Sequence, residues 1–253
     1  TLIQNKQNRG FSHTINAGIA QAKEDIVLLL NTDMDFQNFD IQPILNTFKQ
    51  NPNLFALTPP IYRKNNEGET INESFTTGWF EGGWFRTENI PEIAGTEKEK
   101  EGLPLLWACG GAMYVSREKL NALHAFDTLF SPFYVEDLDL SYRAWKQGWE
   151  VRYTQSTPVN HQHQSTIGTY FTKDYVTKLH LRNQYIFMWK TLSDPLYMIS
   201  HFVTVGVKIL TFQLRDIKAI SAALPFIVTI FKRRTQLKRK KRTDSQILSR
   251  FTR

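Results

Sequence analysis

Three carboxylates lie within four positions of the stretch FYVEDLDLSYRAWKQG, residues 133 to 148. Such crowding is unfavourable unless a cation, a helix N-terminus or a reaction uses the negative field. Asp139 stands four residues before Arg143, the spacing of an ordinary helix ion pair. Glu136 and Asp137 follow the apolar run FSPFY, which could raise a carboxyl pKa toward the range of a general base. The alternative is that this pair only stabilises the first turn of a helix.

A second acidic pair, Asp33 and Asp35, follows the short apolar run DIVLLL. Such a run is typical of a buried strand in a parallel sheet, and ligands bind beyond the carboxyl ends of these strands. Two carboxylates there could hold a divalent cation that neutralises a diphosphate. A polar turn, with Asn31 and Asp33 bonded to nearby backbone, explains the same residues.

Two histidines in VNHQHQST, His161 and His163, lie on one side of an extended segment. Beside an aspartate pair they could complete a metal site, although a lone histidine is more often a surface or core residue. The sequence has no glycine-rich phosphate loop and no Gly-x-Ser-x-Gly motif. Its single cysteine, Cys109, excludes an intramolecular disulfide framework and a cysteine-rich zinc site and favours a cytoplasmic setting.

The apolar spacing predicts helices that alternate with strands, which is an α/β fold. A region rich in glycine and polar residues interrupts the alternation and predicts a long loop or flap. The expected order is a helix over 12–23, strands over 25–30 and 54–62 with a helix over 39–53 between them, the loop over 63–104, a strand over 105–116, a short helix from Ser116 or Arg117, a helix over 136–148, a strand over 149–154 and a helix over 170–191.

An aromatic island, GWFEGGWF, lies inside the predicted loop. Its tryptophans, Trp79 and Trp84, and its phenylalanines, Phe80 and Phe85, could stack on the faces of an acceptor sugar. Packing of at least half of these rings against the domain is an equally good explanation.

The C-terminal part of the chain combines apolar and basic segments. The charge-free runs 195–207 and 219–231 are shorter than the ~20 residues needed to span a bilayer. They predict amphipathic helices lying on a membrane, followed by a basic tail attracted to anionic lipid. Helices packed on the domain, with a solvated tail, are the alternative.

The net charge of +7 is concentrated in that tail. Residues 231–253 carry ten Lys or Arg and one Asp, so the rest of the chain is close to neutral. Nucleic-acid binding through the tail is a rival hypothesis. It leaves the carboxylate motifs without a role and finds no basic groove on the body, so we expect no nucleic-acid partner.

Four blocks in order, NKQNRGFSHTINAGIAQAKEDIVLLLNTDMDF, CGGAMYVSREKLNALHAFDTLFSPFYVEDLDLSYRAWKQGWEVRY, VNHQHQST and LRNQYIFMWK, resemble the family 2 glycosyltransferases of the GT-A fold. They look most like the branch that contains bacterial rhamnosyltransferases. The resemblance covers residues 5 to 190. It implies an α/β fold with a Rossmann-like mixed sheet flanked by helices, followed by C-terminal amphipathic helices.

The resemblance also implies roles for individual residues. Asp137, with Glu136 beside it, matches the general base. The matched donor-binding residues are Asn8, Gly10, Asn16, Asp33, Gly110 and Gly111, the matched ligands of Mg²⁺ or Mn²⁺ are Asp33, Asp35 and His161, with His163 as the alternative, and Phe11, Ala112 and the pair Arg182 and Asn183 belong to the same motifs.

We therefore expect an inverting glycosyltransferase that uses a nucleotide-sugar donor. Its expected acceptor is a saccharide or lipid-linked hydroxyl of a growing cell-surface polysaccharide or glycolipid. The expected location is the cytoplasmic face of the cell membrane, as a peripheral protein. The resemblance divides the chain into a glycosyltransferase domain (1–191), membrane-associating helices (192–231) and a disordered basic tail (232–253).

One departure from the family pattern concerns the start of the sequence. Members begin with βα units that help to hold the nucleotide base, and the resemblance implies that about 60 such residues precede Thr1. An inactive fragment of a glycosyltransferase is therefore an alternative expectation.

Overall fold

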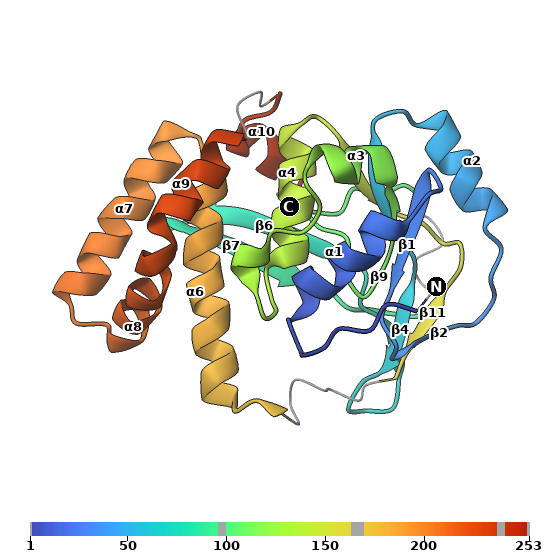
Figure 1. Cartoon of the computed structure of the whole chain (residues 1–253), viewed down its shortest axis with the longest axis horizontal. Coiled ribbons are helices and arrows are strands. Elements are labelled where there is room, and N and C mark those ends of the chain that lie inside the picture. Colours follow the sequence, from blue (N-terminus) through green and yellow to red (C-terminus); the bar gives the residue numbers. More distant parts are fainter. Residues whose placement is uncertain (1, 96–99, 163–169, 237–240, 252–253) are drawn as a thin grey trace.

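A mixed four-stranded sheet lies at the centre of the computed structural model, which describes residues 2–95, 100–162, 170–236 and 241–251 (Figure 1). Within this sheet β9 pairs antiparallel with both β1 and β3, whereas β3 and β10 run parallel. The strands stand in the order β1 (Ile26–Leu30), β9 (Ala112–Ser116), β3 (Leu54–Thr58) and β10 (Glu150–Tyr153).

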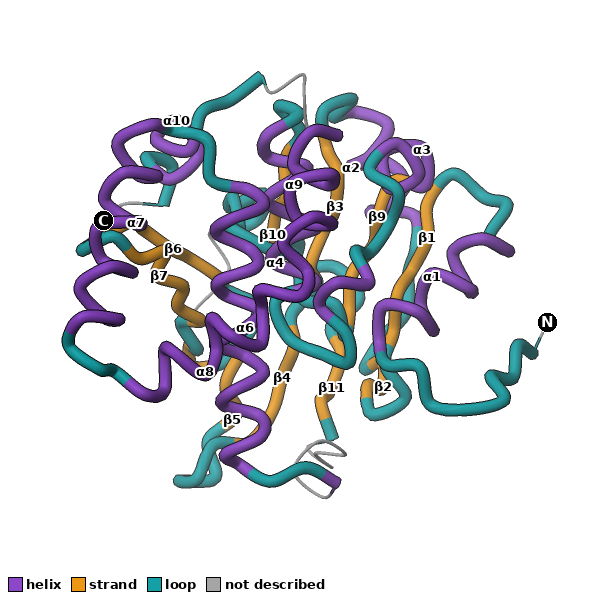
Figure 2. The backbone as a smooth tube through the Cα atoms, turned by 60° about the vertical axis from the view of Figure 1, so that its left-hand side comes forward, coloured by secondary structure: helices purple, strands orange, loops and turns teal. Residues whose placement is uncertain are grey.

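A second sheet continues beyond the ends of β3 and β10 (Figure 2). Its strands are β2 (Met34–Phe36), β11 (Val159–His161), β4 (Ile61–Lys64), β5 (Thr70–Asn72) and β8 (Glu92–Ile93). Strands β2 and β11 pair antiparallel, and β11 and β4 pair parallel. This register brings segments that are more than a hundred residues apart in the sequence side by side.

Helices cover both faces of the central sheet, which confirms the predicted α/β class. Helices α1, α4 and α6 share one buried cluster with one sheet face, and α2 packs on the other. No described helix is long and apolar enough to cross a membrane. The helices are α1 (Phe11–Gln21), α2 (Gln42–Gln50), α3 (Arg117–Ala122), α4 (Glu136–Lys146), α6 (Lys173–Thr191), α7 (Pro195–Leu210), α8 (Leu214–Ala223), α9 (Ile227–Gln236) and α10 (Asp244–Leu248), with short 3₁₀ turns at Thr128–Phe130 and Leu224–Phe226.

The prediction that residues 25–30 form a strand of a parallel sheet buried on both faces is wrong in direction and burial. Strand β1 pairs antiparallel with β9 and lies at the edge of the described sheet, where only its Leu29 is fully buried. A short apolar run indicates a strand but does not encode the direction of its partner.

The predicted long loop over 63–104 is also wrong. It contains four paired strands, β5, β8 and the hairpin of β6 (Thr76–Glu81) and β7 (Trp84–Asn89). Gly82 and Gly83 make its turn with φ angles of 56° and 72°, a conformation that favours glycine. The turn packs on α7, where Thr204 Oγ1 donates to the Gly82 carbonyl at 3.0 Å.

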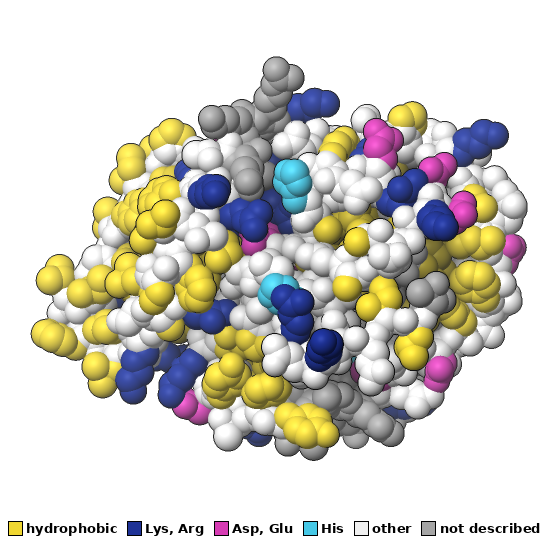
Figure 3. Space-filling model, in the orientation of Figure 1, with side chains coloured by type: hydrophobic (Ala, Val, Ile, Leu, Met, Phe, Trp, Pro, Cys, Tyr) yellow, Lys and Arg dark blue, Asp and Glu magenta, His cyan; other side chains and the backbone are white. Residues whose placement is uncertain are grey.

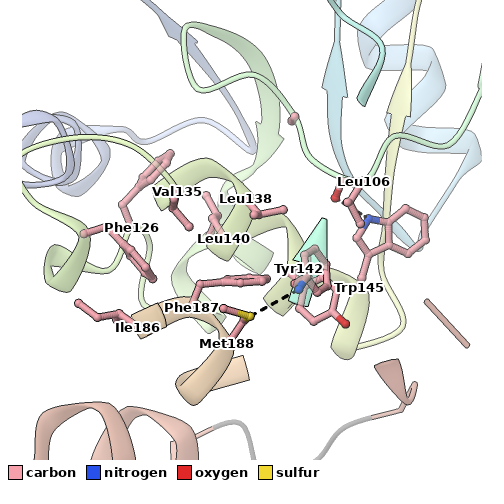
Figure 4. Close-up of a cluster of buried hydrophobic side chains, with 14 of the residues drawn as sticks. Leu106, Phe126, Val135, Leu138, Leu140, Tyr142, Trp145, Ile186, Phe187 and Met188 are labelled. Atoms are coloured by element: carbon pink, nitrogen blue, oxygen red, sulfur yellow. Dashed lines mark hydrogen bonds between the residues drawn. The ribbon is translucent and has the colours of Figure 1, made fainter. Parts of the chain in front are cut away.

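The main core lies between α4 and α6. Figure 4 shows Leu138, Leu140 and Tyr142 of α4 facing Phe187 and Met188 of α6. The dashed line in that view is the hydrogen bond from the Phe85 amide to the Met188 sulfur, 3.5 Å long, which ties the hairpin to α6. The core thus fixes α4 between the sheet, the hairpin and α6.

Helix α4 is buried on almost all sides although it carries five charged side chains. Asp139 is completely buried, and its carboxylate pairs with Arg143 Nε and Lys190 Nζ, both at 2.7 Å. Lys190 Nζ also lies 2.6 Å from Asp127 Oδ2. The predicted pair of Asp139 with Arg143 is confirmed, and it belongs to a larger buried network that joins α4 to α6.

The C-terminal tail differs from the expected disordered segment. Helix α10 begins with a capping box between Thr243 and Gln246 and buries Ile247 and Leu248. Its Asp244 is fully buried and lies 2.5 Å from Lys146 Nζ at the end of α4. The only acid of the tail therefore anchors it, since a buried lysine needs a counter-charge.

We predict that Asp244→Asn lowers the free energy of unfolding by about 3 to 5 kcal/mol, because Lys146 then keeps its charge without a buried partner. Denaturant titration at neutral pH measures the change. Asp174→Asn is the matched control, since Asp174 forms an exposed pair with Lys178 and such pairs contribute less than about 1 kcal/mol. Equal effects of the two substitutions would contradict the anchoring role.

The effect of Asp244→Asn depends on pH. Burial would raise the pKa of Asp244, but the charge of Lys146 and its hydrogen bond outweigh burial and hold that pKa below the ordinary value. The stabilisation is therefore fully present above about pH 5 and decreases as the pH falls through the lowered pKa. The difference between wild type and variant should shrink at acidic pH.

Candidate active site

A clamped loop positions the first turn of α4. Tyr134 and Val135 precede the helix with φ angles of 73° and 76°, which non-glycine residues rarely adopt. The buried Asn183 amide of α6 lies within 2.8 to 3.0 Å of the carbonyls of Phe130, Phe133 and Tyr134. Its neighbour Arg182 donates to the Ser131 carbonyl at 2.8 Å. The Arg182 and Asn183 motif thus holds the strained loop in front of the acidic pair.

Asp137 lies at the partly open end of α4. Its carboxylate accepts the Leu138 amide at 2.8 Å and the Gly110 amide at 3.4 Å. Burial raises the pKa of Asp137, although these backbone bonds oppose the rise. A carboxylate with a raised pKa is a stronger proton acceptor, which suits a general base.

Glu136 is buried beside Asp137, with 9% of its surface exposed. No described residue forms a hydrogen bond with its Oε2 atom. Burial and the charge of Asp137 raise the pKa of Glu136 to about 8. Glu136 is therefore protonated at neutral pH, and Asp137 carries the negative charge of the pair.

The Gly110 and Gly111 turn lies between the two acidic motifs. A Cβ atom on Gly110 would lie 3.4 Å from the Asp137 Cβ, and one on Gly111 would lie 3.0 Å from the Met34 Cε. The Gly111 carbonyl accepts the Asn31 amide at 2.8 Å. The structure therefore brings the Asp33 segment against Gly111 and the Asp137 segment against Gly110, the two neighbouring residues of one close-packed turn.

Asp33 faces His161. The carboxylate Oδ2 lies 3.5 Å from His161 Nε2, and no described residue offers a hydrogen bond to the buried Oδ1. On the other side of the imidazole, His161 Nδ1 lies 2.7 Å from Glu73 Oε1, and Glu73 also pairs with Arg63. Carboxylate, imidazole, second carboxylate and guanidinium form one chain of contacts.

The charges in this chain of contacts determine its protonation. Burial would raise the pKa of Glu73, but hydrogen bonds from His161 and Arg63 outweigh burial and lower it. The hydrogen bond to Glu73, with a contribution from Asp33, raises the pKa of His161 against the effect of burial. A cation bound to His161 Nε2 would displace the proton from this atom while Glu73 kept its hold on Nδ1.

The geometry fits a divalent cation held by two protein ligands. Asp33 offers a buried oxygen to which no residue of the described ranges donates, and Glu73 orients the imidazole as carboxylates behind metal-ligating histidines do. No group of three or more His, Cys, Asp or Glu residues in the described part of the chain is arranged to hold a metal. Mg²⁺ and similar ions commonly take one or two protein ligands and complete their shell with phosphate and water.

Asp35 does not join Asp33 and His161. It pairs with Asn160 across the β2–β11 ladder, so its side chain lies on the face opposite that of His161. There it accepts a hydrogen bond from the Gln162 amide. The expected three-residue metal set is thus reduced to two residues, because strand alternation separates the third. His163 lies outside the described residues.

The three expected donor-binding residues near the start of the chain make structural contacts. Asn16 exchanges hydrogen bonds with the Phe126 backbone, at 2.8 and 3.0 Å, and so uses both ends of its amide. Gly10 has a φ of 80° and packs on Pro132 so closely that a Cβ would lie 2.8 Å from its Cα. Asn8 Oδ1 accepts the Gly10 amide at 2.9 Å. These residues fix α1 against the loop that carries the acidic pair.

The aromatic island is mostly a packing element. Trp84 is 6% exposed, packs edge-on against Tyr185 and lies 4.2 Å under Lys208 Nζ, so it cannot stack on a sugar. Trp79 is partly exposed and donates to Glu81. The exposed aromatic ring beside the acidic pair is Tyr134, whose pKa is raised by burial and by the charge of Glu136.

Sequence reasoning missed Glu73 and Tyr134. Glu73 lies in the region predicted to be a loop, and only the pairing of β4 with β11 brings it to His161. Tyr134 lies inside the stretch 133–148, where its aromatic ring was the available signal of a binding role. Its side chain lies 5.6 Å from the His180 ring in an edge-to-face contact.

Known proteins share sequence with this chain. The profile of the family described as "Glycosyltransferase like family 2" matches residues 1–185. Polypeptide N-acetylgalactosaminyltransferase 11 of Xenopus tropicalis is 25% identical over 165 residues, which are 63% of this chain and 27% of that protein. The chain thus spans about a quarter of the length of this curated relative.

The fold resembles that of a solved glycosyltransferase structure. The crystal structure of GalNAc-T7 with UDP, GalNAc and Mn²⁺ matches with a TM-score of 0.55 and 15% identity, over 77% of this chain and 37% of the other. The mannosyltransferase PcManGT from Pyrobaculum calidifontis, in complex with GDP-Man and Mn²⁺, matches with a TM-score of 0.45 and 12% identity, over 94% and 67%. The first match supports the GT-A type of α/β fold.

We predict that Glu73→Gln weakens binding of Mn²⁺ about tenfold or more, because a neutral amide orients and polarises His161 less well than a carboxylate. Titration of Mn²⁺ alone, followed by electron paramagnetic resonance, measures the affinity. Glu67→Gln is the control, since Glu67 lies on the exposed turn between β4 and β5. Equal affinities of both variants would contradict the role of Glu73.

We also predict that Glu136→Gln stabilises the chain at alkaline pH. Between about pH 5 and pH 8 folded Glu136 keeps a proton that the unfolded chain releases, so wild-type stability falls as the pH rises through this range. Glutamine cannot ionise, and the variant should gain stability relative to wild type over the same range. Urea unfolding at pH 6 and pH 9 tests this, with the exposed Glu118→Gln as control. A pH-independent difference would contradict the burial of an uncompensated acid.

Proposed function

The chain belongs to the glycosyltransferase-like family 2, and on that premise we propose that it transfers a sugar from a nucleotide-sugar donor to an acceptor hydroxyl with inversion at the anomeric carbon. One observation carries the proposal: the Gly110 and Gly111 turn places Asp137 on one side and the Asp33 segment on the other. In-line displacement needs the attacking hydroxyl and the leaving diphosphate on opposite faces of the anomeric carbon, and a base and a diphosphate site on either side of this turn would meet that need.

In this mechanism Asp137 accepts the proton of the acceptor hydroxyl as the oxygen attacks the anomeric carbon. Glu136, protonated at neutral pH, leaves the charge on Asp137 and adds no second anion to the site. Asp33 and His161 would hold Mg²⁺ or Mn²⁺, which when bound neutralises the leaving diphosphate. The Arg182 and Asn183 clamp keeps the base in position.

The acceptor side of the site is proposed from Tyr134. Tyr134 is 38% exposed and lies two residues before the acidic pair, so a sugar stacked on its ring could present a hydroxyl to Asp137. We propose that the acceptor is a lipid-linked saccharide of a growing cell-surface polysaccharide or glycolipid. We also propose that the chain acts like the bacterial rhamnosyltransferases that its sequence resembles. Such an acceptor would place the protein at the cytoplasmic face of the membrane.

A polypeptide hydroxyl is the second candidate acceptor, because the curated relative is by name a polypeptide N-acetylgalactosaminyltransferase. A panel of UDP-, GDP- and dTDP-sugars, each assayed with saccharide and peptide acceptors, separates the two. Nucleic-acid binding by the tail has less support. Arg234 donates to the Trp189 carbonyl and Arg242 to that of Trp149, so these basic side chains serve packing.

We predict that Asp137→Asn reduces the transfer rate about 10² to 10⁴-fold, because the amide cannot accept the hydroxyl proton. Binding of the nucleoside diphosphate with Mn²⁺, measured by calorimetry, should stay close to wild type. Asp25→Asn, at a fully exposed carboxylate, is the control and should keep its activity. Transfer by Asp137→Asn at the wild-type rate would refute the assignment of the base.

A further inference from the structure

Helix α7 presents apolar side chains to solvent along its whole length. Leu196, Ile199, Val203, Val207 and Leu210 follow one another at intervals of three or four residues, so they line one face of the helix. Each is more than half exposed, and Leu196 and Leu210 are 78% and 77% exposed. Soluble proteins rarely leave such a stripe uncovered.

The opposite face of α7 is already used by the core. His201 and Val205 are buried, and Trp189 Nε1 of α6 donates to His201 Nε2 at 3.1 Å. The helix cannot turn its apolar stripe inward without losing these contacts. The stripe is therefore a surface in the folded chain and not an incompletely packed part of the core.

The apolar surface extends beyond α7. Phe212, in the connection to α8, and Leu214, the first residue of α8, are 78% and 65% exposed. Figure 3 shows the hydrophobic side chains gathered over the end of the molecule formed by α7 and its neighbours, with Lys and Arg side chains at its margin. We call the α7 stripe together with Phe212 and Leu214 the α7 surface.

The charges beside the α7 surface have one sign. Residues 195–236 contain six Lys or Arg and a single acid, Asp216. Asp216 is buried, where it lies 2.6 Å from Lys208 Nζ and accepts the Tyr185 hydroxyl at 2.6 Å. Arg215, Lys218 and Lys232 are exposed. The segment thus shows only positive charge to its surroundings.

We propose that the α7 surface binds an anionic lipid bilayer, with α7 lying in the plane of the interface. The apolar stripe would enter the boundary between headgroups and acyl chains, and the exposed Arg215 and Lys218 would contact acidic headgroups. The alternative of a second copy of this chain is disfavoured, because two such surfaces would bring like charges together. No helix needs to span the membrane for this mode of binding.

This inference deepens the proposed function, since a surface-bound enzyme could reach a lipid-linked acceptor. It does not depend on transfer activity, because vesicle binding is measured without donor or acceptor. If the protein transferred sugar but did not bind vesicles, the proposed lipid surface would be refuted and the proposed transfer activity would stand. Loss of transfer in Asp137→Asn with retained vesicle binding would leave the lipid surface in place.

The test uses the whole chain and two kinds of extruded vesicle. One kind is pure phosphatidylcholine, and the other also contains about 30% phosphatidylglycerol, an anionic lipid. We expect flotation with the anionic vesicles and much weaker flotation with the neutral ones. Val203→Asp and Leu210→Asp should each lower the partition coefficient about tenfold or more, since each removes an inserted side chain and adds a negative charge.

Two further variants sharpen the test. Leu45→Asp, on the exposed face of α2, is the matched control for Leu210→Asp and should bind like wild type. Arg215→Gln and Lys218→Gln should each weaken binding to anionic vesicles about fivefold. All variants should keep the circular dichroism spectrum and unfolding midpoint of wild type, because the substituted side chains are exposed.

Three results would overturn the proposal. One is equal flotation of Leu210→Asp and Leu45→Asp. Another is the absence of wild-type binding to either type of vesicle. The third is a wild-type dimer in analytical ultracentrifugation that Leu210→Asp converts to a monomer, which would assign the α7 surface to an interface between copies.

Discussion

Helix α4 carries five charged side chains and is buried on nearly every side. A charge in the interior needs a partner of opposite sign, because its desolvation otherwise destabilises the fold by several kcal/mol, on the order of the whole net stability of a domain. Asp139 takes Lys190 from α6, and Lys146 takes Asp244 from the tail. Each pair joins α4 to a segment at least fifty residues further along the chain.

The three acids at the start of α4 differ because their partners differ. Asp139 forms ion pairs with Arg143 and Lys190 and has a structural role. Asp137 receives only backbone amides, and Glu136 receives no partner among the described residues at its Oε2 atom. The ion pairs of Asp139 hold α4 in the core, and this keeps the start of the helix poorly solvated. The raised pKa values of Glu136 and Asp137 therefore depend on the pairing of Asp139.

Local patterns in the sequence predicted what local physics determines. Helical spacing predicted α4 and its ion pair at positions i and i+4, and the two acidic motifs were visible as clusters of charge. The direction of β1, the face on which Asp35 lies and the position of Glu73 were not predictable in this way. All three follow from which strands pair and in which register, and that information is distributed over the whole chain.

The burial of Trp84 and the order of the tail have the same explanation. Tyr185 and Lys208 cover Trp84, but both lie more than a hundred residues further along the chain. The residues near Trp84 in the sequence therefore do not predict its burial. A basic tail normally remains solvated, and here a single Asp244 reverses that expectation because it meets a buried lysine. The composition of the tail gives its charges, but it does not show that Asp244 pairs with Lys146.

Helix α6 connects the proposed site to the proposed lipid surface. Asn183 clamps the loop before Asp137, Tyr185 donates to Asp216 of α8, and Trp189 donates to His201 of α7. These three residues lie within two turns of one helix, whose rise of about 1.5 Å per residue makes that span short and stiff. Binding of α7 at a bilayer would therefore fix the height and orientation of Asp137 above the lipid. The proposed lipid-linked acceptor would then have to extend far enough from its lipid to bring a hydroxyl to that height, so the geometry of α6 would set the length of acceptor that fits the proposed site.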